Sequence, residues 1–191
     1  MSTTPAPAPR PVGWVGVVAL VLTVASVNVV FPLLSPAKHD PDIVALEFAP
    51  LEGDGKAKEI IDTWQRDGRI EKARWNVRFD YLFILCYSTT LYLACRWAGR
   101  EFAADGYRWA GWLGRWIAVL QVAAGGCDMV ENVFLLLMLE PEAKVEQLAG
   151  WECTFASAKA LLVLVGLVYL LVAFARAVVR LLARPQTSTP A

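Results

Sequence analysis

The chain has 191 residues, of which 57% are hydrophobic and 19% are charged, and its mean hydropathy is +0.45. A soluble domain of this length does not need so apolar a composition, so the sequence predicts an integral membrane protein. The 18 basic and 18 acidic residues give a formal net charge of zero. This balance predicts no nucleic-acid partner, because phosphate binding needs a basic surface.

Four segments meet the requirement of about 20 mostly apolar residues for a membrane-spanning helix. They predict an all-α fold, a four-helix transmembrane bundle that forms a single domain over residues 12–182. The expected spans are 12–34, 81–98, 116–139 and 155–175. Residues 1–11 and 185–191 are rich in Pro, Ser, Thr and Ala, and we expect both to be disordered tails.

The distribution of charge predicts the orientation of these spans. Arginines gather between spans two and three and after span four, whereas the loop between spans three and four is acidic. Lys and Arg are retained on the cytoplasmic side, so both termini are expected in the cytoplasm of a bacterial cell, with the bundle in the plasma (inner) membrane. A cleaved signal peptide over residues 1–37 is the alternative, because Ser35-Pro36-Ala37 resembles a cleavage site.

The segment 35–78, between spans one and two, is charged in both signs but has helical periodicity. Apolar residues recur at helical spacing from about Lys56 to Arg66, and Asp67-Gly68 then marks a turn. We expect a small extracytoplasmic helical segment here, resting on the membrane with Trp64 and Trp75 at the level of the lipid headgroups.

Span three contains two acids and an amide, which is unusual because a charged residue in hydrocarbon is expensive. Asp128 and Asn132 fall on one stripe with Gln121 and Gly125, and Glu131 lies at its margin. The small residues Gly114, Ala118, Gly125 and Gly126 should let a neighbouring helix approach, so this stripe is expected to face protein.

Polar residues of the other spans lie at a similar depth, in the outer half of the bilayer, when depth is counted along each helix. They predict one cluster, consisting of Asn28, Asp80, Tyr87, Asp128, Glu131, Asn132 and Lys159. Lys159 is the expected ion-pair partner of Glu131. Asp128, the deepest acid, is then expected to be a spare carboxyl that holds a proton.

No resident metal or cofactor is predicted. The four cysteines, Cys86, Cys95, Cys127 and Cys153, form no CxxC pair and are interpreted as packing residues. His39 is the single histidine, so a histidine-rich zinc site is not expected.

Four short motifs carry a resemblance to known sequences: Glu59 to Trp64 (EIIDTW), Phe79 to Ile84 (FDYLFI), Asp128 to Asn132 (DMVEN), and Lys159 in the last span. Together they resemble a group of uncharacterised bacterial four-span membrane proteins with a DxxEN motif in the third span. The resemblance implies the four-span architecture, and no activity is attached to it.

Several roles of the polar cluster remain open from the residues. It can be a network that only fixes helix register, or an outward-facing acidic pocket for a lipid, a small amphiphile or a partner helix. It can belong to a lipid-modifying enzyme with Asp128 or Glu131 as acid or base and Lys159 steadying negative charge. It can also serve a proton-coupled transporter.

The lack of a recognised nucleophile, metal set or cofactor loop favours the binding pocket over an enzyme. Membrane lipids are the expected surroundings. A homodimer is plausible for so small a bundle, through the glycine-rich face of span three or through Gly166 of span four.

Overall fold

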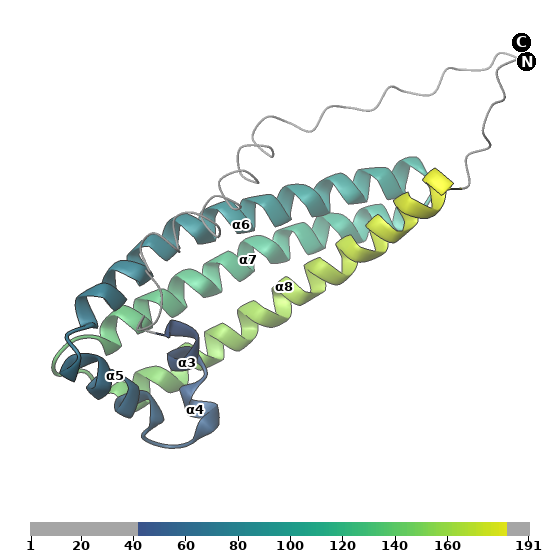
Figure 1. The fold of residues 1–191 in the computed structure, drawn as a ribbon. Helices are drawn as coiled ribbons and strands as arrows, with labels where there is room; N and C mark the ends of the chain where they lie inside the picture. The colour runs from purple at the N-terminus through teal and green to yellow at the C-terminus, as the bar shows by residue number, and fades with distance from the viewer. Residues whose placement is uncertain (1–41, 183–191) are drawn as a thin grey trace, which may run out of the picture.

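The computed structural model describes residues 42–182, which are almost entirely helical and contain no strand. Three long helices, α6 (Ile70–Ala104), α7 (Arg108–Met138) and α8 (Val145–Leu182), run side by side, with α7 between the other two (Figure 1). The all-α prediction is confirmed for this range. The predicted span 12–34 with Asn28, the cleavage site and both tails lie outside the described residues.

Two of these helices, α7 and α8, are long and apolar enough to cross a membrane. They contain the predicted spans 116–139, except for its last residue, and 155–175. The predicted span 81–98 lies within α6, which is less apolar than the other two and does not meet the same measure. At about 1.5 Å per residue, each of the three helices is longer than the roughly 30 Å thickness of a hydrocarbon layer.

Three short helices, α3 (Ile43–Glu47), α4 (Ala49–Glu52) and α5 (Lys56–Arg66), lie across one end of the long helices (Figure 1). We call residues 42–66 the cap, and we call that end of the molecule the cap end. Helix α5 has the bounds predicted from its periodicity. The predicted turn at Asp67-Gly68 is also present, with Gly68 in the left-handed region at φ +67°.

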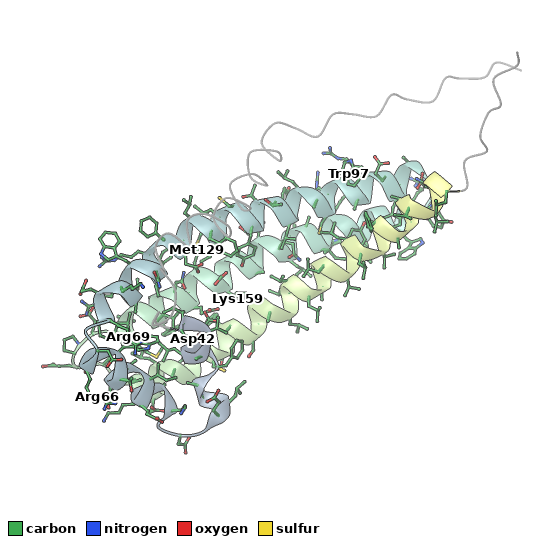
Figure 2. The ribbon with its side chains drawn as sticks, in the orientation of Figure 1. Asp42, Arg66, Arg69, Trp97, Met129 and Lys159 are labelled. Atoms are coloured by element: carbon green, nitrogen blue, oxygen red, sulfur yellow. The ribbon has the colours of Figure 1, made fainter. Side chains whose placement is uncertain are left out.

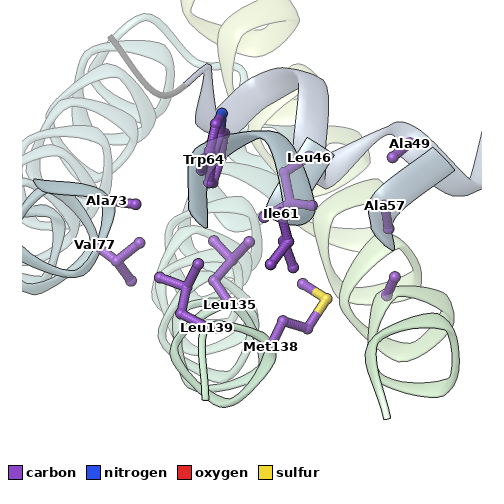
Figure 3. Packing of buried hydrophobic residues seen from close by; sticks show 11 residues of the cluster. Leu46, Ala49, Ala57, Ile61, Trp64, Ala73, Val77, Leu135, Met138 and Leu139 are labelled. Carbon is purple, nitrogen blue, oxygen red and sulfur yellow. The ribbon is translucent and has the colours of Figure 1, made fainter. Parts of the chain in front are cut away.

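The cap shares a buried apolar core with the ends of α6, α7 and α8. Figure 3 shows Leu46, Ile61 and Trp64 of the cap facing Leu135 and Met138 of α7. Trp64 is only 4% exposed and packs inside the protein, whereas Trp75 is 53% exposed; their level relative to lipid headgroups stays a prediction. Packing the Trp64 indole in this core removes a large apolar surface from water.

Polar contacts fasten the cap to the bundle. Both carboxylate oxygens of Glu146, at the start of α8, accept hydrogen bonds from backbone N–H groups at the start of α5: Gly55 at 3.2 Å and Lys58 at 3.1 Å. A carboxylate is favourable there because the first N–H groups of a helix have no partner within it. The guanidinium of Arg74 donates to the carbonyl of Leu139 at 2.9 Å, joining α6 to the end of α7.

Glycine lets the long helices approach each other closely. A Cβ added at Gly111 would lie 2.8 Å from the carbonyl oxygen of Gly99, and one at Gly125 would lie 2.9 Å from Cβ of Ser88. The predicted close approach at Gly114, Ala118 and Gly125 is therefore present, whereas Gly126 faces open space.

The second surface predicted for dimerisation is used within the chain. A Cβ at Gly166 of α8 would lie 2.5 Å from Nε2 of Gln121 of α7, so Gly166 packs against its own bundle. Among the described glycines of the predicted faces, Gly126 is the one left open.

Candidate functional site

The acidic stripe of α7 faces the interior of the molecule, as predicted. Asp128, Glu131 and Asn132 are 5%, 1% and 2% exposed, and Gln121 on the same stripe is fully buried. Helical spacing brings these side chains to one side of α7, and the small residues between them allow α6 and α8 to close over that side.

Lys159 of α8 joins the two acids of α7. Its ammonium Nζ donates to Oδ1 of Asp128 at 3.0 Å and to Oε1 of Glu131 at 2.7 Å. Figure 2 labels Lys159 in the half of the bundle nearer the cap. The predicted pair of Lys159 with Glu131 is present, and Asp128 shares the same cation.

Helix α6 completes the network with two side chains. The hydroxyl of Tyr87 donates to Oδ2 of Asp128 at 2.7 Å, and the amide Nδ2 of Asn132 donates to Oδ2 of Asp80 at 2.9 Å. The structure therefore brings six predicted residues together from three helices: Asp80, Tyr87, Asp128, Glu131, Asn132 and Lys159. We call these six residues the polar cluster. Asn28, the seventh predicted member, lies outside the described residues.

The prediction that Asp128 is the spare carboxyl is wrong. One of its oxygens accepts from Tyr87 and the other from Lys159. Within residues 42–182, the buried carboxylate oxygens without a hydrogen-bond partner are instead Oε2 of Glu131 and both oxygens of Glu152.

Sequence reasoning missed two acids beside the cluster. Glu152 of α8 is completely buried, and its charge interacts with those of Glu131 and Lys159. It lies seven residues before Lys159, which is two helical turns on one face, and Ala149 and Ala156 on that face are also buried. That spacing could have found it.

The second missed acid, Glu47, comes from the cap. Its carboxyl lies beside that of Glu131, and it also feels the charges of Lys159 and Asp80. Burial raises the pKa of Glu47 above its ordinary value; the charges of Asp128 and Asp80 add to this rise, whereas Lys159 and a hydrogen bond with Glu131 oppose it. No periodicity predicts this contact, because it depends on how the cap folds back onto α7 and α8.

The polar character of the bundle falls off away from the cap. Gln121, two turns beyond Asp128, donates from Nε2 to the carbonyl of Leu162 at 3.0 Å. The hydroxyl of Ser88 donates to the carbonyl of Ile84 at 2.6 Å, within its own helix. Beyond Gln121 a buried core follows, made largely of Cys95, Ala98, Phe102, Ala110, Ile117, Ala118 and Tyr169.

The polar cluster is charged and partly open. Asp80, Tyr87 and Lys159 are each partly exposed among the described residues, whereas the acids of α7 are buried. No set of three or more His, Cys, Asp or Glu residues in the range 42–182 has the arrangement of a metal site. The residues of the polar cluster can form hydrogen bonds and charge pairs, and their carboxyl groups can exchange protons.

Comparison with known proteins gives no assignment. No protein-family model matches the chain, and neither a curated protein nor a solved structure matches it.

Proposed function

We propose that this chain is a multi-pass membrane protein that binds the polar head of a small amphiphile in its polar cluster. In this proposal, segment 12–34 and helices α6, α7 and α8 supply four spans, and the cap lies outside the cytoplasm. The amphiphile is a lipid or a single-chain molecule of similar shape, held by contacts and not chemically changed.

The proposed fourfold crossing rests on packing as well as hydropathy. Helix α6 lies along α7 for most of its length, so a bilayer crossed by α7 is also crossed by α6 (Figure 1). Arginines gather where α6 ends and α7 begins and at the end of α8, whereas Glu140, Glu142 and Glu146 lie in the loop between α7 and α8 and at the start of α8. This asymmetry supports cytoplasmic termini and a plasma-membrane location.

The binding proposal rests on one observation: the charged network between the three helices is only partly buried. Tyr87 of α6 and Lys159 of α8 donate to acids of α7 through bonds of 2.7 to 3.0 Å, yet Asp80, Tyr87 and Lys159 remain partly exposed. A network that only fixes helix register gains most when it is sealed from water, because hydrogen bonds are stronger at low dielectric. An open network at this depth suits a ligand with a polar head and an apolar chain.

Ligand-dependent thermal stability tests the proposal. The full chain is purified in uncharged dodecyl maltoside, and its unfolding temperature is measured with added dodecylammonium, dodecyltrimethylammonium, dodecanoate or dodecanol. At least one of these amphiphiles should raise the unfolding temperature to a plateau, because a ligand that binds only the folded state stabilises it.

Variants connect that stabilisation to the polar cluster. Asp128→Asn and Glu131→Gln, each close in shape to the native residue, should reduce it, whereas Arg115→Gln on the exposed side of α7 should leave it unchanged. The proposal is wrong if no amphiphile stabilises the protein, or if folded Asp128→Asn and Glu131→Gln respond like the native chain.

Topology is tested separately with fusion reporters. Green fluorescent protein should fluoresce at either terminus, and alkaline phosphatase should be active when it is inserted between Glu142 and Lys144. An active phosphatase at the C-terminus would contradict the proposed orientation.

A further inference from the structure

The side chain of Glu152 is the least satisfied polar group near the cluster. It is completely buried, and neither carboxylate oxygen has a hydrogen-bond partner among the described residues. A buried polar group without a partner destabilises the fold, and a buried charge does so more strongly. Such a group in a native structure therefore points to something that supplies a donor.

The neighbours of Glu152 make its position still less favourable. Its charge interacts with those of Glu131 and Glu47, which are both negative when ionised. The nearby cation, Lys159, already donates to Asp128 and Glu131. Oε2 of Glu131 is also buried and accepts from no N–H or hydroxyl group, and its neighbour there is the carboxyl of Glu47, another acid. Three carboxylate oxygens thus lack donors in one region: Oε2 of Glu131, and Oε1 and Oε2 of Glu152.

The balance of charge in this region is equally one-sided. Five carboxyl groups, those of Glu47, Asp80, Asp128, Glu131 and Glu152, surround the ammonium of Lys159. Because the described residues offer no arrangement that could hold a metal ion, the missing positive charge is better supplied by an organic cation.

We propose that the amphiphile's head is a protonated primary amine, which donates to Glu152 and to the free oxygen of Glu131. A primary ammonium has three N–H donors, the same number as the oxygens without partners, and it carries the missing charge. This inference rests on the proposed function, because it names the chemical class of the ligand that the cluster binds.

The apolar chain has a matching surface. On the side of Lys159 away from the cap, α8 exposes a series of leucine and valine side chains: Leu161, Leu164, Val165, Leu167, Val168, Leu171 and Val172. These side chains lie on the face of α8 opposite Glu152, so an alkyl chain that starts at the acids passes around α8 to reach this surface, with the amine toward the cap. The cap helices α3, α4 and α5 all contact α8, so they lie over the amine end.

The test compares two cations that share one chain length. Dodecylammonium has three N–H donors, whereas dodecyltrimethylammonium has the same charge and none. The full chain in dodecyl maltoside should be stabilised by dodecylammonium, and half-saturation by the trimethyl compound should need a concentration higher by about tenfold or more, because it cannot hydrogen-bond.

Glu152→Gln and Glu142→Gln form a matched pair of variants. Both remove one acid, but Glu152 is buried and Glu142 is exposed in the loop before α8. Glu152→Gln should raise the dodecylammonium concentration needed for half-saturation by about tenfold or more. Glu142→Gln should leave that concentration unchanged. Glu152→Gln removes a buried acid without a partner, so it should unfold at a temperature no lower than the native chain.

The outcomes separate this inference from the proposed function. Equal responses to the two cations, or a normal response of Glu152→Gln to dodecylammonium, would overturn the amine assignment. Stabilisation by dodecanoate or dodecanol alone would also overturn it, while leaving the proposed amphiphile site intact. If none of the amphiphiles stabilises the protein, both proposals are wrong and the acids of this region hold only protons.

Discussion

The two ends of the three-helix bundle are held together in different ways. Toward the cap, hydrogen bonds to buried acids join the helices: Lys159 of α8 and Tyr87 of α6 both donate to Asp128 of α7. At the other end, which we call the basic end, glycines bring α6 and α7 together, and Tyr169 of α8 donates to the carbonyl of Ala110 at 3.0 Å.

The basic end shows that packing can hold these helices without a buried ammonium. Its charged residues sit at the rim, where Arg176 donates to Asp105 at 3.2 Å and packs 4.0 Å from the centre of the Tyr107 ring. Arg180 also pairs with Asp105. The same three helices thus associate at one end through small residues and at the other through a charged network, so the charges exceed what helix association requires.

The largest effect should come from removing the cation of the polar cluster. Lys159→Met leaves Asp128 and Glu131 buried without their shared partner, which should lower the free energy of unfolding by about 3–5 kcal/mol. Unfolding by sodium dodecyl sulfate in mixed micelles, followed by tryptophan fluorescence, measures this change. The comparison at the basic end is Arg180→Met, which should cost about 1 kcal/mol or less because that side chain is exposed.

A triple variant checks the cause of that loss. Adding Asp128→Asn and Glu131→Gln to Lys159→Met removes the uncompensated charges and should restore most of the stability. If Lys159→Met is as stable as the native chain, the network contributes nothing to the cap end.

The helical pattern of the sequence was sufficient to predict several parts of this arrangement. The stripe of α7, the bounds of α5 and the pairing of Lys159 with Glu131 all follow from residue spacing and from the cost of charge in an apolar region. The position of Trp64 could not be predicted in this way, because it depends on the cap folding onto α7. The proximity of Glu47 to Glu131 has the same origin, since residues far apart in the chain meet there.

Helix approach at the basic end is tested by adding a single methyl group. Gly114→Ala places a Cβ against the hydroxyl of Tyr169 and 2.9 Å from Cα of Gly99, so backbone must shift. The free energy of unfolding should fall by about 1–3 kcal/mol. Gly126→Ala is the matched control, because its Cβ meets open space, and it should be neutral or more stable by about 0.5–1 kcal/mol. Equal effects of the two variants would mean that α6 and α7 do not approach at Gly114.

A tyrosine hydroxyl can be removed at each end of the bundle, that of Tyr87 at the cap end and that of Tyr169 at the basic end. Tyr87→Phe removes a hydrogen bond to a carboxylate and should cost about 1.5–3 kcal/mol, whereas Tyr169→Phe removes one to a carbonyl and should cost about 0.5–1.5 kcal/mol. The same unfolding assay compares them. A larger loss for Tyr169→Phe would contradict the view that charge, more than packing, joins the helices near the cap.

The smallest expected effect concerns the dependence of stability on pH. Burial raises the pKa of Glu47 above 4.5, so this carboxyl binds more protons in the folded chain than in the unfolded chain. Stability contributed in this way is complete below pH 4.5 and is lost as the pH rises toward the raised pKa. Glu47→Gln should therefore make the unfolding temperature fall less steeply than in the native chain between about pH 4 and pH 7.

Comparing how steeply the unfolding temperature falls with pH in the two proteins separates the effect of Glu47 from that of its neighbours. The charged groups that face it are present in both proteins: Asp80, Asp128, Glu131, Glu152 and Lys159. These groups titrate in both proteins, so their effect on the pH dependence cancels when the native chain and Glu47→Gln are compared. This holds for each group whose titration the substitution leaves unchanged. Glu142→Gln, which removes an exposed acid, should keep the native slope. A Glu47→Gln slope equal to or steeper than the native one would place Glu47 in water and detach the cap from the acids beneath it.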